Sequence, residues 1–203
     1  MFMKRERLED LMPPADAELI RRIIQKDETA FDLLFHRYKD HVYRFVFYLT
    51  ENRTEANDLF QETWLRVVRY LPRGSSIRDF KAWVFTIAIN LHRDEIRKKQ
   101  LRRMFFINRS MEGEMENQDF SQADFGLAAS IEDDSNRVDI SLALTRALKK
   151  LPLKQRRVFL LKEMEGFKHE EISGMLHLPV GTVKSLLHRA VKNLQSELIE
   201  FKQ

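Results

Sequence analysis

The chain has 203 residues, a formal net charge of +4 and no cysteine. The absence of cysteine excludes disulfides and thiolate metal sites and fits a reducing compartment. No apolar run reaches the about 18 residues that span a membrane, and the first residues lack the apolar core of a signal peptide. We therefore expect a soluble cytoplasmic protein without membrane insertion. With only 6 Gly and 5 Pro, and apolar residues at helical spacing, the chain is predicted to be all-α.

Charge divides the chain into blocks. Residues 104–139 carry nine Asp and Glu against two Lys and Arg, whereas the residues on either side carry an excess of Lys and Arg. Basic blocks attract a polyanion such as DNA, and an acidic connector is repelled by it and should lie elsewhere. The pattern predicts a lead-in over 1–14, a helical domain over 15–103, an acidic flexible linker over 104–137 and a second helical domain over 138–203.

Two helices are predicted at the start of the first domain, over 15–26 and 28–49, each with an apolar face. The second has a wide aromatic stripe, with His36 and His41 on it or beside it. Five residues is a poor spacing for two ligands on one helical face. We interpret both histidines as packing or surface residues rather than as a metal site.

A third helix is predicted over 54–70, with Thr54 as its N-cap. Glu55, Asp58 and Glu62 recur at helical spacing, but no histidine joins them as a metal ligand. An ordinary solvated acidic face explains them, and a docking surface for a basic partner is the alternative. The residues placed toward the outside of this helix or at its margin are Asp58, Gln61, Glu62 and Trp64.

After a loop over 71–76, a fourth helix is predicted over 79–103. It begins with aromatic residues, including Phe80 and Trp83, and becomes strongly basic beyond Asn90. This combination suits unstacked bases beside a phosphate backbone. A core aromatic cluster followed by a solvated helix end explains it equally well.

The last part of the chain predicts two helices joined by a tight turn, over 168–176 and within 178–194. The second helix has an apolar stripe, and its opposite face lacks a carboxylate and carries Lys184, Ser185, His188, Arg189 and Lys192. A basic face on a helix with a slim start suits the major groove of DNA, so the pair resembles a helix-turn-helix. A helical hairpin whose charged face is only solvated is the alternative.

Several motifs occur in order along these helices: A-N-D-L-F-Q-E-T-W-L-R-V, F-K-A-W-V-F-T-I-A-I-N-L-H-R-D-E-I-R-K, L-P-L-K-Q-R-R-V-F-L-L, E-E-I-S and P-V-G-T-V-K-S. In that order and spacing they resemble bacterial RNA polymerase sigma factors of the extracytoplasmic-function (ECF) group of the sigma-70 family. The resemblance covers residues 15–103 and 138–200. It implies two small helical domains, a four-helix sigma region 2 and a helix-turn-helix sigma region 4.

The resemblance also implies a role for each candidate residue. Region 2 would dock on the clamp helices of the largest polymerase subunit through Asp58, Gln61, Glu62 and Trp64. It would melt the minus-ten element and trap a flipped base, with contacts from Ser75, Ser76, Asn90, Arg93, Arg97 and Lys98. Region 4 would read the minus-thirty-five element with Lys162, His169, Lys184, Ser185, His188 and Arg189. All of these roles are binding roles, so no enzyme activity, cofactor or metal is expected.

The partners implied by the resemblance are core RNA polymerase, including its flap, promoter DNA and an anti-sigma factor. An anti-sigma factor can also hold such a protein at the membrane. The acidic linker resembles the segment that runs toward the RNA exit path of the polymerase. The genes served are expected to respond to stress or to another signal.

Five positions depart from the family pattern. Lys168 stands where a Ser or Thr usually caps the helix, Gly174 lies inside that helix, and His177 stands where a glycine usually makes the turn. Leu186 and Ile89 each replace a frequent arginine. These changes bear on the promoter sequence and on the strength of binding to the minus-thirty-five element, and they leave the class unchanged.

Two other classes of protein fit less of the chain. A stand-alone helix-turn-helix repressor would use residues 1–103 as a sensor or dimer domain and would bind duplex DNA tightly without polymerase. A zinc or carboxylate enzyme is disfavoured, because His169-Glu170-Glu171 lacks the second histidine of the metalloprotease pattern, where the chain has Ser173.

Overall fold

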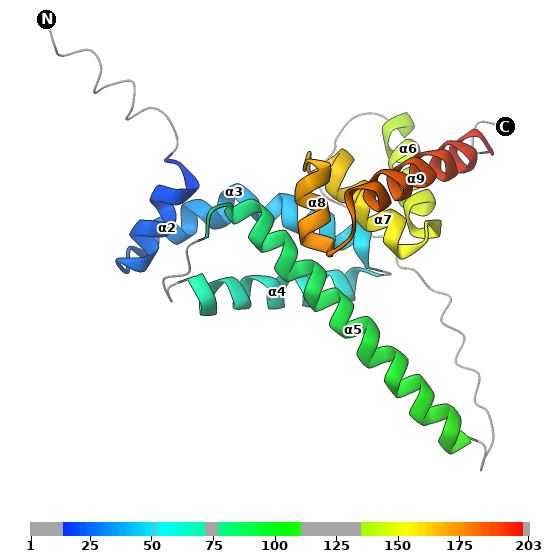
Figure 1. Ribbon diagram of the computed structural model, residues 1–203, viewed down its shortest axis with the longest axis horizontal. Helices are drawn as coiled ribbons and strands as arrows, with labels where there is room; N and C mark the ends of the chain where they lie inside the picture. Colours follow the sequence, from blue (N-terminus) through cyan, green and yellow to red (C-terminus); the bar gives the residue numbers. More distant parts are fainter. Residues whose placement is uncertain (1–13, 51, 72–76, 111–134, 201–203) are drawn as a thin grey trace, which may run out of the picture.

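A computed structural model of the chain describes residues 14–50, 52–71, 77–110 and 135–200 (Figure 1). Most of the described residues lie in helices, and none of them lies in a strand. The elements in chain order are α2 (Asp16–Ile24), α3 (Glu28–Leu49), α4 (Arg53–Tyr70), α5 (Phe80–Ser110), α6 (Ser135–Lys150), α7 (Leu153–Phe159), the π-helix η2 (Leu160–Met164), α8 (His169–Leu176) and α9 (Val180–Glu200).

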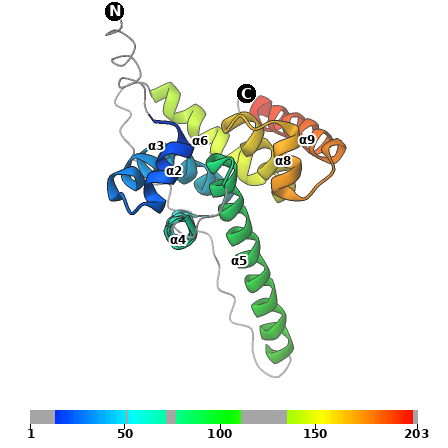
Figure 2. The ribbon, with the colours of Figure 1, turned by 60° about the vertical axis from the view of Figure 1, so that its left-hand side comes forward.

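The N-terminal unit, α2 to α5, is arranged around α3. Helices α2 and α4 both pack on α3, and α5 packs on α4 and α3. Figure 2 shows α4 nearly end-on beside α2 and α3, with α5 running away from them as a single long helix. The core of this unit is aliphatic and aromatic, as the apolar faces predict, and includes Leu34, Val42, Phe45, Leu59, Val84 and Phe85.

Local side-chain hydrogen bonds fix where two of these helices begin. The side chain of Asp27 accepts a hydrogen bond from the Thr29 amide at 3.0 Å and caps α3. The side chain of Asn52 accepts one from the Glu55 amide at 2.9 Å and caps α4. The prediction of Thr54 as the cap is therefore wrong, because the extended residue whose side chain reaches the first turn is Asn52.

The C-terminal unit, α6 to α9, is arranged around α9. Helices α6, α7 and α8 all contact α9. The buried side chains between them include Leu148, Leu160, Leu161, Ile172 and Val183. Because α8 and α9 are joined by a short turn at His177, the predicted helix-turn-helix geometry is present.

The long helices reach into the segment expected to be a linker. Helix α5 continues to Ser110 and α6 begins at Ser135, so residues 104–110 and 135–137 are helical, whereas 104–137 was expected to be a linker throughout. The rest of that segment, 111–134, lies outside the described residues, as do Ser75 and Ser76. No helix in the described part of the chain has the length and apolar character that a membrane crossing requires.

Candidate polymerase and DNA interfaces

The outer face of α4 is acidic at its beginning and apolar further along. Asp58 and Gln61 are exposed, and Glu62 is half-buried with its carboxylate 3.3 Å from the Arg66 guanidinium. Two turns further along the helix from Asp58 and Gln61, Leu65 and Val68 are 58% and 51% exposed. Sequence reasoning missed these two apolar residues, although their spacing of seven from Asp58 and Gln61 places them on the same helical face.

Trp64 does not belong to this face. Its side chain is buried, with 6% exposure, and its ring packs edge-on against Phe35 at a centroid distance of 4.7 Å. Phe31 and Phe60 complete the cluster around it. The prediction that Trp64 lies toward the outside of α4 or at its margin is wrong, because position 64 lies on the side of α4 that packs against α3.

The acidic residues of α4 are split between two environments. The carboxylate of Glu55 lies 2.7 Å from the ammonium of Lys99 on α5, which ties the start of α4 to the basic end of α5. Asp58 and Glu62 remain on the outer face. Within the described ranges, no group of three or more His, Asp or Glu side chains is arranged to bind a metal.

On α5 the structure brings three of the predicted minus-ten residues to one face. The Arg93 guanidinium donates a hydrogen bond to the side-chain oxygen of Asn90 at 2.7 Å, and Arg97 follows one turn later and is exposed. Lys98 is exposed roughly 100° around the helix axis from Arg97, so it lies on another side. The geometry therefore groups Asn90, Arg93 and Arg97 and leaves Lys98 apart.

The aromatic residues at the start of α5 belong to the core of the unit. Phe80 is buried and packs against Tyr38 at 5.3 Å and against Trp83 at 5.9 Å. Trp83 is half-buried at the margin. Of the two interpretations that the sequence left open, the core aromatic cluster describes Phe80.

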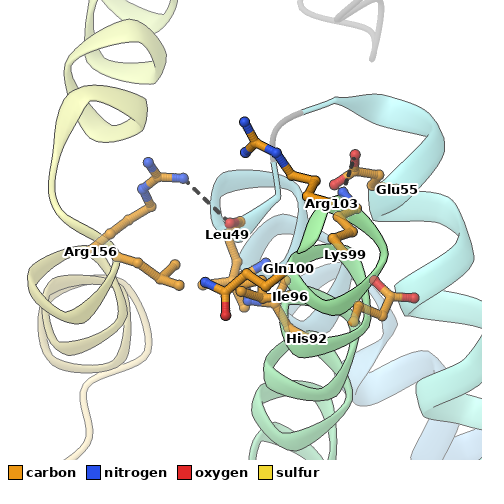
Figure 3. Close-up of a pocket in the computed structure, with 10 residues that line it drawn as sticks. Leu49, Glu55, His92, Ile96, Lys99, Gln100, Arg103 and Arg156 are labelled. Atoms are coloured by element: carbon orange, nitrogen blue, oxygen red, sulfur yellow. Dashed lines mark hydrogen bonds and ion pairs between the residues drawn. The ribbon is translucent and has the colours of Figure 1, made fainter. Parts of the chain in front are cut away.

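The opposite side of α5 faces the C-terminal unit across a cavity of about 290 Å³. Figure 3 shows its lining, with Lys99 paired to Glu55 and the Arg156 guanidinium directed at the carbonyl of Leu49, 3.4 Å away. His92 lies at this cavity, 6% exposed, with the guanidinium of Arg157 3.1 Å from its Nδ1. Burial, and then the positive charge of Arg157, lower the pKa of His92 to about 3. Sequence reasoning did not single out His92, Arg156 or Arg157.

Unusual residues stand at both ends of α8, Lys168 at its N-cap and His177 at its C-cap. Lys168 provides no side-chain cap, and the Glu171 carboxylate accepts a hydrogen bond from the Lys168 amide at 2.6 Å. His177 adopts the left-handed conformation, with φ 54° and ψ 47°. The turn is closed by two hydrogen bonds between Ser173 and Leu178.

The predicted reading face of α9 is open to solvent. Lys184, Ser185, His188 and Arg189 are exposed, and they lie opposite the buried Val183, Ala190 and Leu194. Lys162 in η2 and His169 at the start of α8 are half-buried and lie on neighbouring elements. Leu186, which stands where an arginine is frequent, packs against the hydrophobic core.

Both units match known families. Residues 34–102 match the family described as Sigma-70 region 2, and residues 141–194 match Sigma-70, region 4. The ECF RNA polymerase sigma factor SigW of Bacillus subtilis (strain 168) is 32% identical over 181 residues, covering 88% of this chain and 94% of that protein. The RNA polymerase sigma-H factor of Pseudomonas aeruginosa is 27% identical, covering 90% and 93%.

Solved structures show the same fold. The sigma factor RpoE in complex with the anti-sigma factor NepR from Bartonella quintana has a TM-score of 0.59 at 24% identity, covering 83% of this chain and 96% of that chain. CnrH in complex with the cytosolic domain of CnrY has a TM-score of 0.63 at 21% identity, covering 92% and 99%.

The fold and the two family matches define a transcription initiation factor built from sigma-70 regions 2 and 4. The likeness to SigW over most of both chains is specific to one group. The chain therefore belongs to the ECF group of the sigma-70 family and functions as an RNA polymerase sigma factor. The predictions of family, fold class and function are confirmed.

Proposed function

We propose that this sigma factor binds core RNA polymerase through α4, opens the minus-ten element with α5 and reads the minus-thirty-five element with α9. The observation that carries the proposal is the face of α9. It presents Lys184, Ser185, His188 and Arg189 to solvent, with Val183 and Ala190 buried behind them. A helix with this distribution can enter a major groove and keep its packing intact.

The docking surface proposed for the clamp helices of the largest subunit is the outer face of α4. Asp58, Gln61 and Glu62 supply the polar contacts, and Leu65 and Val68 extend them with exposed apolar area. Interfaces gain most of their affinity from apolar contacts surrounded by polar ones. Leu65 and Val68 are therefore as important to this proposal as the carboxylates.

The minus-ten surface proposed on α5 is built around Asn90. Because the Arg93 guanidinium donates to its side-chain oxygen, the Asn90 amide is oriented before DNA arrives. An oriented amide suits hydrogen bonding to the edge of an unpaired base, while Arg93 and Arg97 suit the phosphate backbone. Ser75 and Ser76 remain proposed contacts from the loop outside the described residues.

In the minus-thirty-five reader, Lys184 and Ser185 near the start of α9 are proposed to meet base edges. His188 and Arg189 follow one turn later, and Lys162 and His169 are proposed as flanking phosphate contacts. All of these groups act by binding. We therefore infer that the sigma factor is not an enzyme and that RNA synthesis belongs to the polymerase.

Regulation is proposed to follow the family. An anti-sigma factor would sequester the protein in the cytoplasm or at the membrane, and its release would switch on a regulon that responds to stress or another signal. The repressor alternative is not favoured, because the matched families include the polymerase-docking region 2 as well as the helix-turn-helix.

In vitro transcription on fragmented genomic DNA tests the proposal, with bacterial core polymerase and with or without this chain. We expect new discrete start sites preceded by two shared upstream elements. Gln61→Ala should reduce all starts together, whereas Ser185→Ala should change their relative use. Tight duplex binding by the chain alone, without any new start site, would contradict the proposal and favour a repressor.

A further inference from the structure

The minus-ten face proposed on α5 continues past the residues assigned to it. Asn90, Arg93 and Arg97 are followed on the same side of the helix by Leu101 and Met104, because successive members are three or four residues apart. Leu101 and Met104 are 48% and 63% exposed. A stripe that begins with polar and charged groups therefore ends in two exposed apolar side chains.

The part of α5 that carries these two residues projects from the N-terminal unit. Every residue from Arg97 to Met104 is exposed, and the helix continues to Ser110. Figure 2 shows this part of α5 running away from α2, α3 and α4 as a single helix. An α-helix with its side chains is about 10–12 Å in diameter, and the major groove of B-DNA is about 12 Å wide. The end of α5 therefore has the dimensions of a helix that can enter a major groove.

The charges around the apolar pair indicate what it would contact. Residues 97–104 include five Lys and Arg and no Asp or Glu. Arg97 and Lys98 lie four and three residues before Leu101, so they are its neighbours on the helix surface. Asp94, an exposed carboxylate near this stripe, precedes Leu101 by seven residues, or about 10 Å. A cationic helix end with an apolar stripe suits a polyanion that also presents apolar groups, and in the major groove that group is the C5-methyl of thymine.

The distance from Asn90 indicates which part of the promoter is within reach. Leu101 and Met104 follow Asn90 by 11 and 14 residues, or about 16 and 21 Å along the helix. At about 3.4 Å per base pair, this length corresponds to about five or six base pairs. Opening extends from the minus-ten element toward the start site. The DNA that stays double-stranded beside this element therefore lies on the side of the minus-thirty-five element.

We propose that Leu101 and Met104 are specificity-determining residues that contact thymine methyl groups in the major groove of the duplex beside the minus-ten element. Arg97 and Lys98 hold the phosphates of the same duplex. The sigma factor thus reads a third stretch of the promoter, within the spacer, in addition to the two elements. This inference rests on the proposed minus-ten role of Asn90 and adds recognition of the adjoining duplex.

Replacement of thymine by deoxyuridine tests the contact, because it removes only the C5-methyl group. The DNA is a promoter that this sigma factor uses, with thymines in the roughly six base pairs next to the minus-ten element. It is prepared with either thymine or deoxyuridine at those positions. Binding of the holoenzyme, which is core polymerase with the full chain, is measured on both. The wild type should bind the deoxyuridine promoter about fourfold more weakly for each methyl group that it buries.

The double variant Leu101→Ala/Met104→Ala removes both apolar side chains and keeps good helix formers at both positions. It should bind the thymine promoter about as weakly as the wild type binds the deoxyuridine promoter, and it should not distinguish the two. Leu33→Ala is the matched control, because Leu33 on α3 is 47% exposed and lies outside the proposed face. This control should keep the wild-type preference.

Two results would overturn the inference. One is equal binding of both promoters by the wild type, and the other is a deoxyuridine penalty that persists in the double variant. Weaker association of the double variant with core polymerase without DNA, with its methyl preference unchanged, would make the pair a protein contact and overturn the inference as well.

The inference and the proposed function fail in different ways. A wild-type holoenzyme that opens no promoter would contradict the proposed function. A holoenzyme that opens the promoter without distinguishing thymine from deoxyuridine would contradict only the role of Leu101 and Met104.

Discussion

On helix α4, Trp64 is a packing residue, whereas the nearby Gln61 is a candidate binding residue. Trp64 follows Gln61 by only three residues, yet it is buried among Phe31, Phe35 and Phe60, while Gln61 is exposed. Trp64→Ala should lower the free energy of unfolding of region 2 by about 3–5 kcal/mol, because it leaves a large cavity.

Urea denaturation followed by circular dichroism measures this loss. Gln61→Ala is the matched control on the same helix. It should leave the denaturation midpoint unchanged and weaken association with core polymerase instead. A Trp64→Ala variant that is fully stable but fails to bind core would restore the contact role that its burial argues against.

His92 predicts a pH dependence of stability at the residue scale. Burial and Arg157 lower its pKa from 6.5 to about 3 in the folded chain. Below about pH 6.5 the unfolded chain takes up a proton that the folded chain does not. The contribution of neutral His92 to the free energy of unfolding is therefore fully present above about pH 6.5. It is lost as the pH falls toward 3, by about 1.4 kcal/mol per pH unit.

The measurement is the difference in unfolding free energy between the wild type and His92→Gln, from about pH 7.5 to 5. The glutamine keeps an acceptor for Arg157 and cannot be protonated. The slope of the unfolding free energy against pH should fall, at the acid end of this range, by close to the amount that corresponds to one proton. Equal slopes in both proteins would show that His92 is accessible to protons in the folded state.

At the scale of elements, helix α8 and the turn that follows it each carry one residue that costs stability. Gly174 lies inside α8, where an added Cβ meets nothing within 4 Å, so Gly174→Ala should stabilise region 4 by about 1 kcal/mol. His177 has a φ of 54°, a conformation that glycine adopts without strain, so His177→Gly should also raise stability, by about 0.5–1 kcal/mol.

Thermal unfolding checks both changes against Gly166→Ala. Gly166 has a φ of 75°, so this control should lower the melting temperature even though it makes the same chemical change as Gly174→Ala. A lower melting temperature for Gly174→Ala would show that α8 is not an ordinary helix at that position.

Helix α9 predicts a specific salt dependence of DNA binding. If Lys184 neutralises a phosphate, Lys184→Ala should reduce the slope of log K against log salt by about 0.9. Lys154→Ala removes the same charge from an exposed position of α7 outside the proposed face, and it should change the slope less. An unchanged slope with altered base preference would assign Lys184 to base readout.

At the scale of the whole molecule, the two reading faces belong to one chain and must meet one face of the DNA helix together. Inserting five base pairs between the promoter elements, about half a turn of B-DNA, should therefore abolish transcription. Inserting a single base pair should reduce it far less. Runoff transcription from promoters that differ only in the spacer measures both. Equal activity at all spacings would mean that only one element is read.

The sequence by itself determined the local features of this protein. Apolar spacing along 28–49, 54–70 and 178–194 predicted α3, α4 and α9, because a helix face is set by residues three and four apart. The same spacing placed Lys184, Ser185, His188 and Arg189 on the exposed side of α9. The order of the motifs identified the family, since each motif is a local pattern read along the chain.

Only the tertiary structure decided which residues of those helices are available. Trp64 and Phe80 are buried because α3 covers the sides of α4 and α5 on which they lie, and periodicity does not reveal how wide a packed face is. The Asn52 cap depended on one side chain reaching one amide. The contacts of Glu165 with His41 and Lys81 join residues 124 and 84 positions apart. Helical periodicity relates only residues within a few turns, so these contacts between the two units emerged from the fold alone.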